Sequence, residues 1–374
     1  NIWERLYRIK TNDRVGSSYC FSGPMGSGKE YAAIEFGKLL NCEKFDKTPC
    51  NKCSSCFKFK SLQHPNIKII VPLPSSAKSN KGSGPLDGLN QEDLELLTSS
   101  IINKGKDPFY KINIPNARRI TISSIRDLRR NVYLKSQTSG RKVILIFDAH
   151  LLSEGAGESA NALLKILEEP PKNTTLILVT DKRSMLLPTI LSRCQIINFP
   201  RLSPQTVLNI LENNGVENKN AIEIASLSDG NINLALELSK QSTLQQTFSE
   251  LEELIKLITT LNQNGWRKFI ENFSMMANRK PEEFKFKIYM LQLWFNIAYS
   301  NRLGNTDSSK FVLLVESLTA FNSAFPNADL AGINQILEET IESLIRNYYT
   351  PLTLINLLIS MQRLLKGKEP LSIL

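Results

Sequence analysis

The chain has 374 residues, which is too long for one ordinary hydrophobic core and predicts two or three domains. Its hydrophobic content of 41% and charged content of 22% are those of a soluble globular protein. No apolar run reaches the roughly 18 residues that a membrane span requires. We therefore expect no membrane partner and a cytoplasmic protein.

The charge is unevenly distributed along the chain. The net charge is +10, and residues 1–200 carry 30 Lys and Arg against 18 Asp and Glu, or +12, which leaves −2 for residues 201–374. A basic N-terminal half suggests a polyanionic partner such as nucleic acid or nucleotide phosphates. A merely solvated basic surface explains an excess of this size equally well.

The first motif along the chain is a glycine-rich turn. A short β-like run over residues 17–22 leads into Gly23-Pro-Met-Gly-Ser-Gly-Lys-Glu30, and helical periodicity follows from Tyr31 to Leu40. Strand, glycine-rich turn and helix form the context of a phosphate loop, whose backbone amides and lysine bind phosphate oxygens. The candidate residues for binding ATP or ADP are Gly23, Gly26, Gly28 and Lys29.

The residue after Lys29 departs from the phosphate-loop pattern. This position normally holds Ser or Thr, whose hydroxyl ligates magnesium. Here it is Glu30, whose carboxylate repels a polyphosphate and removes the usual metal ligand. The departure leaves nucleotide binding open and predicts that efficient hydrolysis is lost.

Four cysteines follow at short spacings, Cys42-(x7)-Cys50-(x2)-Cys53-(x2)-Cys56. Four thiols at such spacings can converge on one tetrahedral Zn²⁺, as structural four-cysteine sites require, and no position is left open for chemistry. We predict a structural zinc module over residues 42–56. His64, before a proline, is expected to belong to a turn because the four cysteines already fill the tetrahedron.

The segment after the cysteines is the least regular part of the sequence. A Ser/Gly/Lys-rich stretch begins after Val71-Pro-Leu-Pro74 and runs to about Asn90. We expect an irregular insertion over residues 73–116, with one short helix between Gln91 and Pro115. The sequence suggests no role for it.

Alternating helices and apolar strands resume at Ile120. An amphipathic helix from Ile122 to Leu134 carries Arg126, Arg129 and Arg130 on one face, which either contacts a DNA backbone or is simply solvated. A further helix runs from Ala160 to Glu169. Three apolar runs predict buried strands at Val143–Phe147, Leu176–Thr180 and Gln195–Phe199. This alternation predicts a parallel sheet covered on both faces.

The character of the sequence changes after Pro200. Short helices with a break at Gly230 are followed, from about Gln245, by an almost purely helical pattern. The aromatic stripe around Trp294 is expected to lie in a core or a subunit interface.

Taken together, the motifs resemble the clamp-loader subunits of bacterial DNA polymerase III, members of the AAA+ family. The residues that carry the resemblance are the cysteine cluster after the phosphate loop, His64-Pro65-Asn66, Asn161-Ala-Leu-Leu-Lys-Ile-Leu-Glu-Glu-Pro-Pro171 and Leu191-Ser-Arg-Cys194. The resemblance implies an α/β AAA+ nucleotide-binding core over residues 1–202 with the inserted zinc module. A small helical lid over 203–242 and an all-helical oligomerisation collar over 243–374 would follow.

Departures from the family pattern indicate the type of subunit. The family's active motor subunit ends its apolar strand with an Asp-Glu pair that organises magnesium and the attacking water. An ungapped alignment puts Phe147 and Asp148 at these positions, whereas a shift of one residue puts Asp148 and Ala149 there. One acid is missing in either case. The lid motif also offers Asn233 where the motor subunit has an arginine.

With Glu30, these departures make three defects in one hydrolytic site and predict a degenerate ATPase. Arg193 of the Ser-Arg-Cys motif is intact. In the family this arginine reaches the γ-phosphate of a neighbouring subunit's ATP, so the resemblance is to the stationary delta-prime type, with Arg193 catalytic in trans. A surface charge at the sheet edge is the alternative for Arg193.

The resemblance also implies partners: the other subunits of a hetero-pentamer, the sliding clamp and primer-template DNA within the complex. Thr180, at the end of its strand, is either a sensor of the γ-phosphate or a plain strand-terminal threonine. Two other functions remain open. One is an ATP-hydrolysing motor subunit of gamma/tau type, and the other is a non-catalytic zinc-containing DNA-binding protein.

Overall fold

A computed structural model describes residues 2–74, 84–134, 138–155, 157–240, 244–304, 314–345 and 348–370. The chain divides into two compact units. The first comprises Asn1–Leu202 with Asn231–Asn233, and the second comprises Ser203–Gly230 with Leu234–Leu374. Much of the expected Ser/Gly/Lys-rich loop falls on residues 75–83, outside the described residues.

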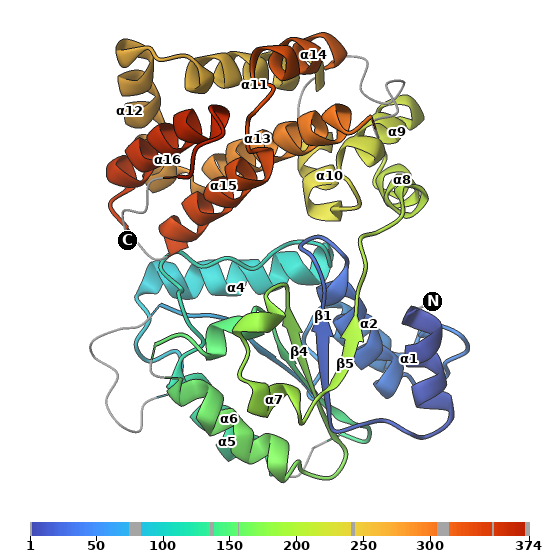
Figure 1. The fold of residues 1–374 in the computed structure, drawn as a ribbon. Coiled ribbons are helices and arrows are strands. Elements are labelled where there is room, and N and C mark those ends of the chain that lie inside the picture. The colour runs from blue at the N-terminus through green and yellow to red at the C-terminus, as the bar shows by residue number, and fades with distance from the viewer. Residues whose placement is uncertain are drawn as a thin grey trace. The chain divides into compact units, whose positions relative to one another are not determined.

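The first unit contains a five-stranded sheet in which every neighbouring pair is parallel. The strand order is β2-β3-β4-β1-β5 (Figure 1). The strands are β1 Ser18–Ser22, β2 Ile67–Ile70, β3 Lys142–Ile146, β4 Thr174–Thr180 and β5 Gln195–Asn198. The predicted parallel α/β core is confirmed, but the edge strand β2 was not predicted, because Lys68 interrupts its short apolar run.

Helices cover both faces of the sheet, because successive side chains of a strand point to opposite sides. In β1, Tyr19 and Phe21 belong to one core cluster and Cys20 to the other. The first cluster includes residues of α1 (Ile2–Thr11), α2 (Lys29–Asn41) and α4 (Gln91–Lys106). The second includes residues of α5 (Ile122–Val132), α6 (Glu158–Glu168) and α7 (Pro188–Leu191). Shorter elements are α3 Ser54–Lys60, η1 Ala149–Leu152 and η2 Arg183–Met185.

The insertion is more regular than the sequence predicts. Helix α4 has 16 residues and begins after Asn90, whose side chain accepts a hydrogen bond from the Asp93 amide. The expected helix between Gln91 and Pro115 is present, but it is longer than the short helix predicted. The inward face of α4 consists of Leu97, Ser100, Lys104 and Gly105. Because only one of these four is a large apolar residue, the helical period is hidden in the sequence.

The second unit is helical throughout its described residues. Its helices are α8 Pro204–Asn213, α9 Asn218–Leu227, α11 Leu244–Thr259, α12 Gln263–Arg279, α13 Pro281–Arg302, α14 Val315–Ala324, α15 Leu330–Ile345 and α16 Thr350–Leu365, together with all but the first two residues of α10 Ile232–Ser239. Trp294 is 1% exposed and contacts the rings of Phe295 and Phe321, which places the aromatic stripe in a core. Within the described ranges, no helix has the length and apolar character needed to cross a membrane.

Candidate functional site

The predicted phosphate loop lies at the carboxyl end of β1 and leads into α2. Gly28 precedes the helix with a φ of 77°, in the left-handed region that favours glycine. At Gly23 an added Cβ would lie 2.1 Å from the carbonyl oxygen of Phe199, so the close approach of two backbones requires glycine. Lys29 is 7% exposed, and its Nζ donates to the carbonyl oxygen of Pro24 at 2.8 Å. The structure therefore brings Lys29 and the loop glycines, Gly26 among them, together.

Thr180 stands beside this loop. It pairs in register with Ser22, the last residue before the loop. Its Oγ1 accepts a hydrogen bond from the Lys182 amide at 3.1 Å and lies 3.2 Å from Nδ1 of His150. This position is consistent both with a sensor of the γ-phosphate and with a plain strand-terminal threonine. The local hydrogen bonds alone are enough to explain a polar residue there.

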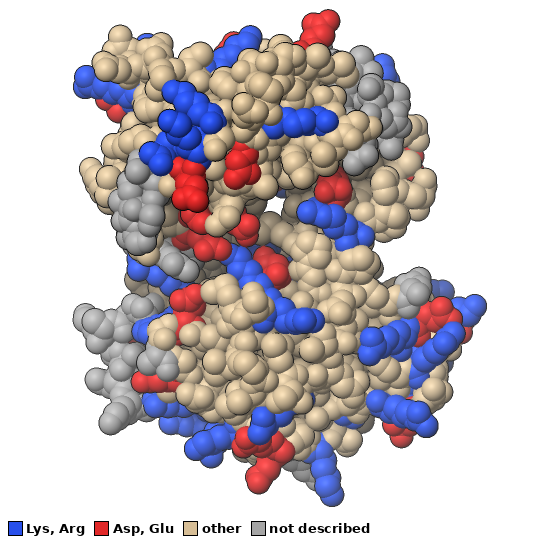
Figure 2. Space-filling view, viewed as in Figure 1, with Lys and Arg blue, Asp and Glu red and all other residues tan. Residues whose placement is uncertain are grey.

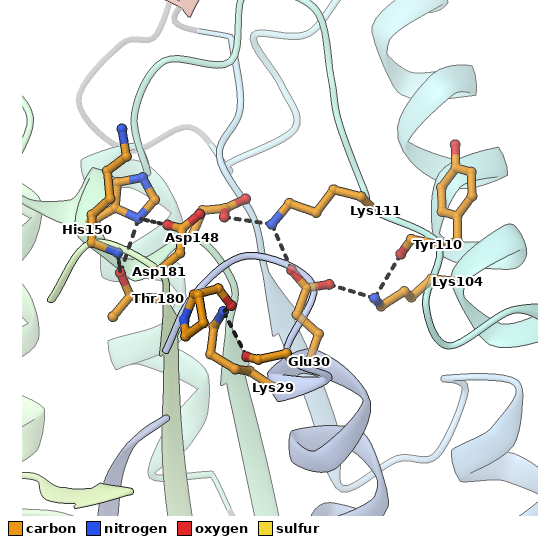
Figure 3. A network of polar contacts seen from close by, with 12 residues as sticks. Lys29, Glu30, Lys104, Tyr110, Lys111, Asp148, His150, Thr180 and Asp181 are labelled. Atoms are coloured by element: carbon orange, nitrogen blue, oxygen red, sulfur yellow. Dashed lines mark hydrogen bonds and ion pairs between the residues drawn. The ribbon is translucent and has the colours of Figure 1, made fainter. Parts of the chain in front are cut away.

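Glu30 is the centre of an ion-pair network in the phosphate loop (Figure 3). Its Oε2 lies 2.5 Å from Nζ of Lys104, and its Oε1 lies 2.7 Å from Nζ of Lys111. The same Lys111 ammonium lies 2.6 Å from Oδ1 of Asp148, and Lys104 also donates to the carbonyl oxygen of Tyr110 at 2.7 Å. Both lysines come from the insertion, so this segment is tied directly to the phosphate loop.

The network is ionised. Burial alone would raise the pKa of Glu30, but Lys111 and Lys104 outweigh it and lower that pKa to about 2. Burial would lower the pKa of Lys111, but Asp148 and Glu30 raise it above its ordinary value. Burial lowers the pKa of Lys104, and the adjacent Glu30 carboxylate opposes this shift. Glu30 therefore carries its negative charge next to two cations and not against an unscreened phosphate.

The sequence alone did not identify Lys104 and Lys111. A weak signal was present near Lys111, because Ile112 and Ile114 are buried while Lys111 and Asn113 are exposed. This period of two indicates an extended segment that lies against the core with Lys111 on its outer side. No local pattern shows which partner Lys111 reaches.

The two residues that follow β3 point to different environments. Phe147 is 1% exposed and belongs to the core, whereas Asp148 turns toward Lys111 at a φ of 50°. Asp148, His150 and Asp181 offer ligand atoms that all lie within 4.8 Å of one another. Asp148 is nevertheless already paired with Lys111. The single acid that faces the loop from β3 is Asp148.

The four cysteines come together as predicted. Cys42, Cys50, Cys53 and Cys56 place their sulfur atoms within 4.8 Å of one another, and the sulfurs of Cys50 and Cys56 are 3.9 Å apart. A tetrahedron with Zn–S bonds of about 2.3 Å has S···S edges of about 3.8 Å. The Cys53 amide donates to Sγ of Cys50, and the Cys56 amide donates to Sγ of Cys53. Amide hydrogen bonds from Lys52 and Cys53 lower the pKa of Cys50 to about 6, whereas burial raises the pKa of Cys42 and of Cys56. The arrangement of the four sulfurs is what fits zinc.

His64 lies outside the cysteine cluster. Its ring is buried and stacks on Phe59, with the ring centroids 4.5 Å apart. Nδ1 accepts from the Asn66 amide at 3.0 Å, and Nε2 lies 3.2 Å from Oγ of Ser55. This is the structural turn that the sequence predicts.

Arg193 lies at the opposite end of the sheet from the phosphate loop. Its carbonyl oxygen accepts from Oγ of Ser18, the first residue of β1, whereas the loop follows Ser22. At about 3.3 Å per residue, these ends of β1 are roughly 13 Å apart. The Arg193 guanidinium lies 2.9 Å from Oε1 of Glu168 and donates to the carbonyl oxygen of Thr189. Arg193 therefore does not belong to its own chain's phosphate loop.

The basic residues of the first unit do not form one large patch on the face drawn in Figure 2. Lys and Arg side chains stand around the rim of the α/β unit there, and its centre is largely uncharged. Arg126, Arg129 and Arg130 of α5 are exposed, as the sequence predicts. Exposure alone does not distinguish a DNA contact from a solvated helix face.

A family model decides the family of this chain. The model described as "DNA polymerase III, delta subunit" matches residues 1–203, which is more than half of the chain. The chain belongs to this family. The predicted resemblance to a clamp-loader subunit of delta-prime type is therefore confirmed.

Relatives agree with this membership. The chain is 25% identical to DNA polymerase III subunit delta' of Bacillus subtilis over 338 residues, covering 90% of this chain and 87% of the relative. It is 28% identical to subunit delta' of Haemophilus influenzae over 226 residues, which cover 60% and 54% of the two chains. It is also 30% identical to subunit tau of Bacillus subtilis over 249 residues, covering 65% of this chain but 36% of the relative. Both delta-prime and tau proteins are thus among its relatives.

Proposed function

We propose that this chain is the delta-prime-like stator of a replicative clamp loader and that Arg193 acts on the ATP of a neighbouring subunit. The observation that supports this most directly is the location of Arg193 at the amino ends of the strands, away from the chain's own phosphate loop. A residue at this edge can serve a nucleotide only across a subunit boundary.

The chemistry of Arg193 suits this role. A guanidinium is planar and permanently charged, and it can stabilise the charge that develops on a γ-phosphate during transfer. Glu168 holds the guanidinium at 2.9 Å, and the Thr189 carbonyl oxygen accepts a second hydrogen bond. The side chain is 35% exposed, so it remains accessible to a partner.

The chain's own loop supports a stator and not a motor. Glu30 and Asp148 are both engaged by lysines, and Phe147 takes a core position at the strand end. Hydrolysis in this family of sites requires a positioned metal and a positioned water. ATP or ADP bound at Gly23, Gly26, Gly28 and Lys29, with Thr180 nearby, would therefore be held without being turned over.

We also propose that Cys42, Cys50, Cys53 and Cys56 bind one structural Zn²⁺. Four thiolates would complete its coordination, so the ion would fix the turn between α2 and α3 and supply no reactive position. We further propose that residues 203–242 form a small helical lid and that residues 243–374 form an oligomerisation collar. The proposed partners are the other subunits, the sliding clamp and primer-template DNA. The proposed location is the cytoplasm.

The test is ATP turnover by the complex reconstituted with a motor subunit. Arg193→Ala should reduce turnover by about 10³-fold, the scale that such arginines contribute. Arg183→Ala is a matched control. Arg183 is also an exposed arginine, but it lies beyond the carboxyl ends of the strands, where its guanidinium donates a hydrogen bond to Oδ1 of Asn198. Equal turnover with wild-type and Arg193→Ala protein would contradict the proposal.

The second candidate function is a gamma/tau-like motor subunit, which is favoured by the 30% identity to a tau protein. It predicts magnesium-dependent hydrolysis by the isolated chain that Lys29→Ala abolishes. A non-catalytic zinc-containing DNA-binding protein predicts instead tight, salt-dependent DNA binding by the isolated chain. The stator proposal expects neither result.

A further inference from the structure

We propose that Lys111 takes the place of the magnesium ion in this phosphate loop, so that the insertion makes the site independent of divalent metal. Lys111 acts in the chain's own loop and independently of Arg193.

The two positions that would hold magnesium are both occupied by carboxylates. In phosphate-loop proteins the ion is held by the residue after the loop lysine and by an acid at the end of another strand. In this chain the first position is Glu30, and the acid after β3 is Asp148. Oxygen atoms alone would suit magnesium, so the residue types do not by themselves exclude it.

What excludes it is the cation already between them. The Lys111 ammonium lies 2.7 Å from Oε1 of Glu30 and 2.6 Å from Oδ1 of Asp148. Figure 3 shows the side chain reaching between the two carboxylates. An ion that bound both oxygens would have to displace the ammonium, or stand beside it with the same sign of charge. The residues present therefore do not fit magnesium.

The backbone around Lys111 fixes it in this position. Ile112 and Ile114 are 6% and 3% exposed and belong to the core cluster of this face. Just before Lys111, Phe109 stacks on Tyr31 of α2 with the ring centroids 5.2 Å apart. Lys111 is thus anchored on both sides by apolar contacts, although its own side chain is 43% exposed.

A second lysine prevents Glu30 from turning away. Lys104 has a side chain that is 1% exposed, and its Nζ lies 2.5 Å from Oε2 of Glu30. Its other contacts are the Tyr110 carbonyl oxygen at 2.7 Å and the ring of Phe147, whose centroid is 5.4 Å away. Glu30 is consequently held with one oxygen toward Lys111. This gives the insertion a role, which is to supply the cations of the phosphate loop.

Manganese, a paramagnetic substitute for magnesium, provides the test. Its binding to the full chain, already loaded with zinc, is measured by electron paramagnetic resonance. The variants are Lys111→Met, the charge-retaining control Lys111→Arg, and each of these combined with Asp148→Asn. We expect wild-type and Lys111→Arg chains to show no manganese binding that depends on Asp148. Lys111→Met should gain one such site, weakened at least tenfold by Asp148→Asn.

Two results would overturn the proposal: Asp148-dependent manganese binding by the chain with Lys111 intact, or a folded Lys111→Met chain that gains no site. If Lys111→Met does not fold, the melting temperatures of the wild-type and Asp148→Asn chains are compared with and without magnesium. The proposal expects magnesium to leave the melting temperature of the wild type unchanged. A rise with magnesium in the wild type that is absent in Asp148→Asn would contradict it. Neither result depends on Arg193. The manganese experiment can therefore contradict the role of Lys111 without contradicting the stator proposal, and the turnover experiment can do the reverse.

Discussion

Arg193 and Glu168 form an ion pair, with 2.9 Å between Nη2 and Oε1, that joins the turn before β5 to the end of α6. The two side chains are 35% and 49% exposed. A pair this exposed to solvent contributes little to stability. We therefore expect its main effect to be the orientation of the Arg193 guanidinium.

Glu168→Gln should therefore change the free energy of unfolding by less than about 1 kcal/mol. In the reconstituted complex it should lower ATP turnover by about fivefold at most, which corresponds to a loss of about 1 kcal/mol of orientation. Arg193→Ala should have the far larger effect given above. Glu169→Gln is the control, because this exposed neighbouring residue contacts Tyr133 and Lys165 through its backbone carbonyl oxygen and amide. An effect of Glu168→Gln as large as that of Arg193→Ala would be inconsistent with a positioning role.

Glu30→Gln should destabilise the first unit by about 3 kcal/mol, because it leaves the buried Lys104 ammonium without its counter-ion. Hydrogen exchange of the β1 and β4 amides measures the free energy of opening of this unit. Glu4→Gln serves as a control in an exposed pair of the same unit, in which Arg8 and Glu4 are 69% and 56% exposed, and should cost about 0.5 kcal/mol or less. A cost for Glu30→Gln as small as that of the control would mean that Lys104 is not held by this carboxylate.

The same pair should make the first unit sensitive to acid. The folded pKa of Glu30 is lowered to about 2, below the roughly 4.3 of an unfolded glutamate. The contribution of Glu30 to stability is therefore fully present above pH ~4.3 and is lost as the pH falls through about 2. The exchange free energies of β1 and β4, measured across this window, should fall more steeply for the wild type than for Glu30→Gln. Parallel curves would show that Glu30 titrates normally.

The cysteine cluster should hold one zinc per chain, measured by atomic absorption on the purified protein. Cys53→Ser removes one of four ligands and should reduce the content several-fold, with faster hydrogen exchange in α3, which Cys53 caps. Cys194→Ala is the control, because this thiol lies outside the cluster. Full zinc content in Cys53→Ser would remove that residue from the ligand set.

Trp294→Ala should destabilise the second unit of the isolated chain by about 3–5 kcal/mol, because the indole is fully buried between Phe295 and Phe321. Urea unfolding monitored through the remaining tryptophans provides the measurement. Ile222→Ala, at a side chain that is 51% exposed, should change the stability by less than about 1 kcal/mol. Loss of stability only when partner subunits are added would indicate a subunit interface.

Much of this protein is determined by patterns within short stretches of its sequence. The apolar runs in β3 and β4 predicted buried parallel strands because a strand buried on both faces is apolar at most positions. The cysteine spacing predicted a cluster because three of the four ligands lie within one turn and the start of α3. Glycines and Lys29 predicted the phosphate loop because its geometry is a local property of the backbone.

The tertiary structure alone decided what Glu30 does. From the sequence this residue is a defect that repels phosphate, whereas in the fold it is the shared partner of Lys104 and Lys111, which are 74 and 81 residues away. Helix α4 was likewise underestimated, because one of its inward-facing residues is a lysine whose partner lies on another element. An ion pair between distant segments leaves no periodicity in the sequence, since its free energy depends on a distance that only the packed core sets.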